Sequence, residues 1–146
     1  MQHNACTKEA ATAIKSITQV CPVASFTDGG STSGYMDFTS TIPADSIVLG
    51  WKAVTTTAAQ WDNDTTAVMT VGISGATDKF SGGGAASVAA AGTTGDVGKL
   101  ATNAPLVFVD TVTTPRVTIT GGSDFTAFVT AADCSSTVTI YYIPLA

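Results

Sequence analysis

Few side chains in this sequence could carry out acid–base or nucleophilic chemistry. Its 146 residues include a single histidine, His3, and a single glutamate, Glu9, and both lie near the N-terminus. A Ser–His–Asp or Cys–His arrangement would have to bring that imidazole into the folded domain. Of the 11 acidic residues the other ten are Asp, and most stand beside Gly, Pro or Asn, where an Asp carboxylate stabilises turns. We therefore predict no catalytic residues and a protein that is not an enzyme.

Metal and cofactor motifs are equally weak. Asp62–Thr65 resembles the first positions of a calcium-binding loop, but the distal Glu of such a loop is missing. Ser81–Ala86 is rich in glycine, yet the Gly-Lys-Ser/Thr of a phosphate-binding loop does not follow it. We expect a tight turn at the first segment and a flexible loop at the second, with no bound metal and no cofactor.

Three cysteines, Cys6, Cys21 and Cys134, show no spacing typical of metal ligands. The residues after Met1 lack the basic stretch and apolar run of a signal peptide, so we expect synthesis in a reducing cytoplasm. The cysteines are then expected to be small buried side chains rather than a disulfide framework. An oxidised Cys6–Cys21 pair outside the cell is the alternative.

Charge is scarce in this chain. Hydrophobic residues make up 45% of it and charged residues 12%, with a net charge of −5. The cations are scattered singly, at Lys8, Lys15, Lys52, Lys79, Lys99 and Arg116. Nucleic-acid binding needs a clustered basic face, and a membrane span needs about 20 apolar residues in a row. We expect neither partner, and a surface this poor in charge suits a protein that works inside an assembly.

The aromatic residues are divided between core and surface. Trp51 lies on the apolar face of an expected strand, which predicts a core position. Trp61 stands beside the acidic turn and could belong either to an interface or to the rim of the core. Tyr141 and Tyr142 are adjacent in an expected strand, so one should point inward and the other toward a sheet surface or a subunit contact.

From residue 31 onward the sequence is typical of an all-β domain. Runs of β-branched and aromatic residues alternate with Gly, Asp, Asn and Pro breaks, which predicts a two-sheet antiparallel sandwich, jelly-roll-like, over 31–146. The expected strands are Tyr35–Ser40, Ser46–Thr55, Thr66–Ser74, Leu106–Thr113, Arg116–Thr120, Phe125–Thr130 and Thr137–Ile143. Residues 75–105 lack this pattern and are expected to be a long surface loop.

Alternation within these runs predicts which residues face the core. Three sets share one face each: Ile47, Leu49, Trp51 and Ala53; Ala67, Met69, Val71 and Ile73; and Val138, Ile140 and Tyr142. The expected core comprises Trp51, Met69, Val71, Val117, Val129 and Ile140.

Residues 1–30 form an N-terminal arm of different texture. Apolar residues recur at steps of three and four, which favours a short helix within residues 7–20: Ala10, Ala13, Ile14, Ile17 and Val20. Pro22 would end that helix; an extended strap is the alternative. Since so short a segment is not stable alone, it must pack either on its own domain as a strap or on a neighbouring subunit or the capsid as an anchor.

Three phrases of the β region resemble small virion proteins of tailed phages. They are Thr41–Trp51, Thr66–Ser74 with the following Asp78–Phe80, and Ser136–Pro144. Together with their spacing, they are similar to head decoration (cement) proteins, over about residues 35–145. The resemblance implies a jelly-roll-like body, a homotrimer, and the major capsid protein as partner on the outer surface of the capsid. It implies no functional residue.

Two other virion roles stay open. One is a host-recognition module of a fibre or tail that binds a surface glycan, for which Trp61, Asp62 and Asp64 are the candidate patch. The other is a structural protein of the neck or tail. All three roles are non-enzymatic.

Overall fold

The computed structural model describes residues 13–57, 67–82, 86–87, 106–126 and 135–145. Over these residues the chain is almost entirely β, and no helix among them is long and apolar enough to cross a membrane. The elements are β1 (Lys15–Pro22), η1 (Val23–Ser25), β2 (Thr27–Asp28), β3 (Ser33–Asp37), β4 (Ser46–Thr57), β5 (Val68–Gly72), β6 (Ala86–Ser87), β7 (Val107–Val109), β8 (Arg116–Thr120) and β9 (Ser135–Pro144).

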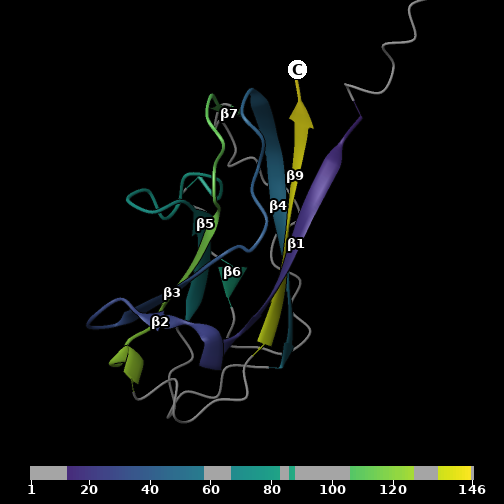
Figure 1. Cartoon of the computed structure of the whole chain (residues 1–146). Coiled ribbons are helices and arrows are strands. Elements are labelled where there is room, and N and C mark those ends of the chain that lie inside the picture. The colour runs from purple at the N-terminus through teal and green to yellow at the C-terminus, as the bar shows by residue number, and fades with distance from the viewer. Residues whose placement is uncertain (1–12, 58–66, 83–85, 88–105, 127–134, 146) are drawn as a thin grey trace, which may run out of the picture.

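The strands form two antiparallel sheets that face each other (Figure 1). The first, here called the long-strand sheet, has the order β1-β9-β4-β7, and the second, the short-strand sheet, has the order β2-β3-β8-β5-β6. The pairings are nested: β1 with β9, β3 with β8, β4 with β7, and β5 with β6. Successive nested pairs alternate between the sheets, which is the topology of a jelly roll. The predicted two-sheet sandwich is confirmed.

Alternation is clearest in β9, the central strand between β1 and β4. Val138, Ile140 and Tyr142 are buried, whereas the residues between them are partly exposed. Ala67, Met69 and Val71 are likewise buried at the start of β5 and within it. These two predicted faces are confirmed, except that Ile73 is only partly buried beyond the end of β5.

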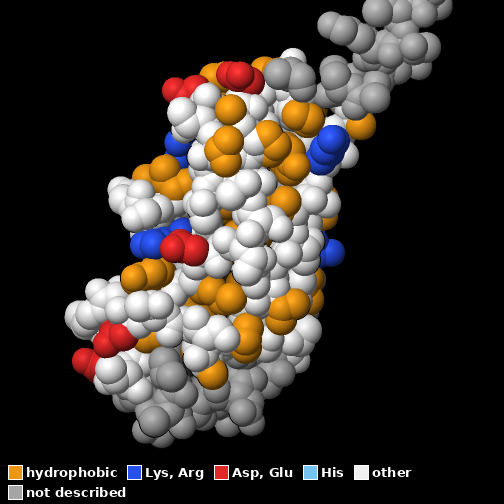
Figure 2. Space-filling model, in the orientation of Figure 1, with side chains coloured by type: hydrophobic (Ala, Val, Ile, Leu, Met, Phe, Trp, Pro, Cys, Tyr) orange, Lys and Arg blue, Asp and Glu red, His pale blue; other side chains and the backbone are white. Residues whose placement is uncertain are grey.

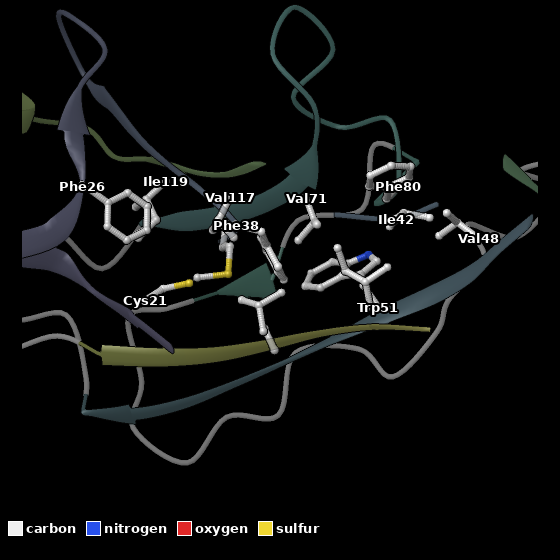
Figure 3. Close-up of a cluster of buried hydrophobic side chains, with 14 of the residues drawn as sticks. Cys21, Phe26, Phe38, Ile42, Val48, Trp51, Val71, Phe80, Val117 and Ile119 are labelled. Atoms are coloured by element: carbon white, nitrogen blue, oxygen red, sulfur yellow. The ribbon is translucent and has the colours of Figure 1, made fainter. Parts of the chain in front are cut away.

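The core fills the space between the two sheets (Figure 3). Cys21, Phe26 and Ile119 lie at one end of the labelled cluster, and Val48 and Phe80 lie at the other, with Trp51 between them. Five of the six predicted core residues are buried: Trp51, Met69, Val71, Val117 and Ile140. The sixth, Val129, lies outside the described residues.

One predicted face is wrong at the start of β4. Val48 is buried in the core, whereas Ile47 and Leu49, which were expected there, are partly exposed. The register against β9 shifts between Val48 and Gly50, so Leu49 is the extra residue of a β-bulge. The bulge changes which side alternate residues face, so strict alternation from Trp51 back to Ile47 fails.

The helix expected within residues 7–20 is wrong where the structure describes it. Lys15–Pro22 is strand β1, at the edge of the long-strand sheet, and the extended alternative is the one observed. Gln19 helps to hold this strand, because its Oε1 accepts hydrogen bonds of 3.1 Å from both the backbone N–H and the hydroxyl of Thr39. A β partner and β-branched side chains thus outweigh a helical spacing of apolar residues. Residues 1–12 lie outside the described part.

The strand expected over Phe125–Thr130 is wrong at its start, because Phe125 and Thr126 are helical. The Asp124 carboxylate accepts a hydrogen bond of 2.9 Å from the Thr126 N–H, as a residue that caps a helix does. Phe125 is fully buried, and its ring packs against Phe26 and directly over Gly34 of β3.

The remaining expected segments differ from the structure in length. The strand predicted over Leu106–Thr113 is limited to β7, and Thr113 makes only an isolated bridge to Ile42. The loop expected over 75–105 contains a short strand, β6, which pairs with β5. Ser81, from the glycine-rich segment, is buried, and its N–H donates to the Val71 carbonyl at 3.0 Å.

Candidate interaction surface

The structure describes only part of the chemistry-bearing residues that the sequence singled out. Among its described residues, no three His, Cys, Asp or Glu side chains come together to hold a metal ion. The following candidates lie outside the described residues: His3, Cys6, Glu9, Trp61, Asp62, Asp64 and Cys134. The calcium-loop and glycan-patch interpretations therefore concern residues that the structure does not describe.

Cys21 is the one cysteine within the described part of the chain. Its thiol is 1% exposed and is not part of a disulfide. Burial raises its pKa to about 12, because the thiolate would lose its hydration in the core. Nucleophilic chemistry requires the thiolate, so Cys21 is a structural side chain, as expected.

The tyrosine pair of β9 is divided between the two faces, as predicted. Tyr142 is buried against the core, while Tyr141 lies on the outer face and is partly exposed. Trp51 is 3% exposed, which confirms its predicted position in the core.

The outer face of the short-strand sheet carries a stacked ion pair. Arg116 of β8 donates two hydrogen bonds to the Asp37 carboxylate of β3, at 2.6 and 2.8 Å. The same guanidinium lies 3.8 Å from the centre of the Tyr35 ring, within range of a cation–π contact. The bonds from Arg116 hold the pKa of Asp37 below its usual value, and they raise the pKa of Arg116. The guanidinium and the carboxylate are hydrogen-bonded to each other, and the guanidinium also stacks on the Tyr35 ring. The three side chains therefore form a structural cluster.

The outer face of the long-strand sheet carries an apolar surface at one end. Ile47 of β4 is the Cα partner of Phe108 on β7 and of Ile143 on β9, so three apolar side chains form a row across three strands. We call this surface the apolar end; it also includes the exposed residues one position beyond β1, β7 and β9: Ile14, Leu106 and Leu145.

The apolar end is unusually open to solvent. Ile14, Leu106, Phe108 and Leu145 are between 51% and 64% exposed. Figure 2 shows hydrophobic side chains gathered at the end of the molecule where β4, β7 and the end of β9 lie. Neighbouring exposed apolar side chains on a small domain are typical of a surface that contacts another molecule.

The opposite end of the same face carries hydroxyl groups instead. Thr18 of β1 and Thr139 of β9 share a hydrogen bond of 3.0 Å between their hydroxyls, and the Thr56 hydroxyl donates to the Ser135 carbonyl at 3.0 Å. Val20, 55% exposed, is an apolar side chain among them. One face of one sheet therefore has an apolar end and a hydroxyl-rich end.

Charges lie on two sides of the apolar end. Asp45 and Asp110 are exposed and stand next to the paired residues Ser46 and Val109, at the β4–β7 side. Lys15 is exposed on β1, at the other edge of the sheet, and its pairing with the buried Tyr142 places it on the inner side of that strand. Figure 2 shows acidic side chains over the β4–β7 side and a basic one over β1.

Sequence reasoning missed the apolar end, although a signal was present. Ile47-Val48 and Tyr142-Ile143 are apolar at two successive positions, so both faces of the strands are apolar there. When one face of an antiparallel sheet is in water, apolar and polar residues alternate along each strand. Two successive apolar residues therefore indicate that the outer face is also apolar at that point. By local sequence alone these runs predict strands but not which residues of neighbouring strands they meet.

Comparison with known proteins gives a weak structural likeness. No family model matches the sequence, and no curated protein gives a significant match. The fold is similar to a chain of a solved structure titled "Cyanophage Pam1 capsid asymmetric unit", which is 20% identical, with a TM-score of 0.44. The likeness covers 88% of this chain and 86% of that chain.

Proposed function

We propose that this chain is a non-enzymatic decoration (cement) protein on the outer surface of a tailed-phage head. In this role it bridges neighbouring subunits of the major capsid protein and acts as a homotrimer. The apolar end is the observation on which the proposal chiefly depends. A protein that works by contact needs a surface to bury, and the apolar end occupies the outer face of the long-strand sheet.

The resemblance to phage virion proteins gives independent support. Its three phrases coincide with structural units: the turn into β4, strand β5 with the turn that follows, and strand β9. β4 and β9 also supply Ile47 and Ile143 of the apolar end. The residues that carry the resemblance therefore belong both to the core and to the candidate surface.

A cement protein of this kind stabilises a shell without chemistry. Each copy adds contact area between capsid subunits, and a trimer makes several such contacts at once. The second and third contacts are intramolecular once the first has formed, so the effective affinity rises steeply. The low charge of the chain, 12% of residues, fits a surface that is covered in use.

Copy number in purified virions tests the proposal. A cement protein should occur in a number comparable with that of the major capsid protein, whereas a fibre, neck or tail protein should be far rarer. Quantitative densitometry of virion proteins, with the major capsid band as internal standard, gives this ratio.

Adding the pure protein to heads that lack it provides a functional test of the proposal. Heads prepared without this chain should open at a lower temperature, and addition of the pure protein should restore the original value. The proposal is wrong if the chain is absent from the head fraction, or if saturating protein leaves the opening temperature unchanged.

A further inference from the structure

We infer that the outer face of the short-strand sheet is a binding site for a neutral saccharide, centred on Thr118 and the Tyr35 ring. Unlike the apolar end, this face presents hydroxyl groups in adjacent rows beside one aromatic ring. The inference goes beyond the proposed function and is independent of it, because it concerns the other sheet and a small ligand.

Three rows of outward-facing residues cross the middle of this sheet. Each row has one residue from β3, one from β8 and one from β5: Asp37, Arg116 and Gly72; Tyr35, Thr118 and Thr70; and Ser33, Thr120 and Val68. The alternate residues of β8, Val117 and Ile119, are buried in the core, so the rows lie on the outer face. Five of these nine residues carry a hydroxyl group, and the charges of Asp37 and Arg116 cancel.

Thr118, in the middle row, has an unpaired hydroxyl. The residue is 8% exposed, and its Oγ1 has no hydrogen-bond partner among the described residues. The Oγ of Ser46 is likewise unpaired, but Ser46 lies on the core side of its strand with Val48. A buried hydroxyl without a partner is unfavourable, and a ligand on the outer face could supply that partner.

Tyr35, the β3 neighbour of Thr118, provides an aromatic surface in a fixed position. The Arg116 guanidinium lies 3.8 Å from the ring centre and is itself held by two hydrogen bonds to Asp37. Arg116 belongs to the row on one side of Tyr35, and the row of Ser33 lies on the other side. The ring is therefore covered by the guanidinium on one side only. The negative charge of an aromatic face attracts the C–H bonds of a sugar ring.

Two loops flank these rows. The backbone of Ala76 and Thr77 lies directly over Gly72, so the turn after β5 stands on the outer face beside Arg116. The hairpin that joins β2 and β3 lies beyond Ser33, at the other end of the rows. Figure 1 shows both loops projecting on the same side of the molecule. A ligand on this face would therefore meet protein at both ends.

The chemistry of these rows indicates the class of ligand. Threonine hydroxyls both donate and accept hydrogen bonds, as the hydroxyls of a sugar do. A nucleic acid would need free cations, but Arg116, the cation of these rows, is paired with Asp37. A protein partner would need apolar anchors, and Val68 is the one aliphatic side chain in the rows. A neutral saccharide matches a face with hydroxyls, one aromatic ring and no net charge.

Nuclear magnetic resonance of the isotope-labelled full-length protein tests the inference, with cellotetraose, maltotetraose and N-acetylchitotetraose as probes. At least one probe should shift the backbone amides of β3 and β8, with a dissociation constant in the millimolar range. Glycerol at an equal concentration of hydroxyl groups is the ligand control and should leave these amides unchanged.

Variants of Thr118 separate binding from folding. Thr118→Val keeps the shape of the side chain and removes its hydroxyl, so it should weaken binding roughly tenfold. Thr118→Ser keeps the hydroxyl and should retain most of the affinity. Thr139→Val, the same change on the outer face of the long-strand sheet, is the matched control and should leave the affinity unchanged. Thermal unfolding shows which variants are folded; if Thr118→Val is not, Tyr35→Leu should abolish the shifts.

Three results would overturn the inference: no probe shifts these amides, glycerol shifts them equally, or Thr118→Val binds as tightly as the wild type. Weaker binding of Tyr35→Leu to phage heads, without any saccharide binding by the wild type, would identify the face as a protein contact and also overturn it. Saccharide binding by a chain that is absent from heads supports the inference and contradicts only the proposed function.

Discussion

The long-strand sheet and the short-strand sheet enclose the same core but differ on their outer faces. The short-strand sheet, whose strands have two to five residues, carries on its outer face the Arg116 guanidinium, which is bound to Asp37 and stacked on Tyr35. The long-strand sheet contains strands of eight, ten and twelve residues and leaves an apolar end uncovered. One outer face thus carries a satisfied polar cluster, whereas the other leaves apolar side chains exposed.

The largest expected effect tests whether buried side chains of the two sheets contribute equally to the stability of one core. Ile140→Ala in β9 and Ile119→Ala in β8 each remove a fully buried side chain and leave a cavity. We expect each to lower the free energy of unfolding by about 3–4 kcal/mol, measured by urea denaturation of the folded protein. Thr139→Ala on the outer face is the control and should change it little. A loss confined to one of the two isoleucine variants would show that the sheets do not share a single core.

The next effect is specific to the short-strand sheet. A Cβ at Gly34 would lie 2.0 Å from Cζ of the buried Phe125 ring, so Gly34→Ala forces the ring to move. We expect a loss of about 2–3 kcal/mol, again by urea denaturation.

Gly75→Ala is the control for this prediction. Gly75 has open space around it and a φ of +83°, so only backbone strain of about 1 kcal/mol should appear. If Gly34→Ala costs no more than Gly75→Ala, the close approach of Phe125 does not limit the packing of β3.

A smaller effect concerns the ion pair on the short-strand sheet. Because Arg116 lowers the pKa of Asp37 below 3.8 in the folded chain, the pair stabilises the protein above that pH. The contribution is lost as the pH falls through the folded-state pKa. Since the Asp37 side chain is 47% exposed, solvent screening limits it to about 1 kcal/mol or less.

Asp37→Asn should therefore be slightly less stable than wild type at pH 7, with the difference vanishing in acid and shrinking in high salt. Thermal unfolding across pH 3–7 measures it. Asp110→Asn is the control, because Asp110 has no ion-pair partner among the described residues. A difference between Asp37→Asn and wild type that is constant with pH would exclude the ion pair as its cause.

The smallest effect is expected on the outer face of the long-strand sheet. Val20→Ser and Phe108→Ser replace exposed side chains, so each should change the stability of the monomer by less than about 0.5 kcal/mol. Unfolding is measured in dilute solution, below the association range. A loss above 1 kcal/mol for Phe108→Ser would mean that this side chain supports the fold rather than a contact.

Particular elements show how far sequence reasoning reaches in this molecule. The faces of β9 and the positions of Trp51 and Met69 followed from alternation, because a half-buried strand must repeat with period two. The bulge at Leu49 could not be predicted this way, since it depends on the register of β4 against β9. Strand β1 could not be predicted either. Its local sequence favours a helix, and its extended conformation depends on pairing with β9.

The candidate surface illustrates the same limit. Ile47, Phe108 and Ile143 lie far apart in the sequence, and only the sheet order places them in one row. Each is an ordinary strand residue by its local sequence. Their juxtaposition depends on long-range pairing, which a single sequence does not display.

The nested pairing of strands also determines the order in which this molecule can be completed. β9 lies between β1 and β4, yet it is synthesised after every other strand that the structure describes. Until it emerges, β1 and β4 have no common neighbour, and the long-strand sheet cannot close. Contacts of such long sequence separation make folding slow, and unpaired strand edges are exposed during the wait. High-level expression should therefore yield aggregates when synthesis is fast, and slower synthesis at low temperature should favour the folded protein.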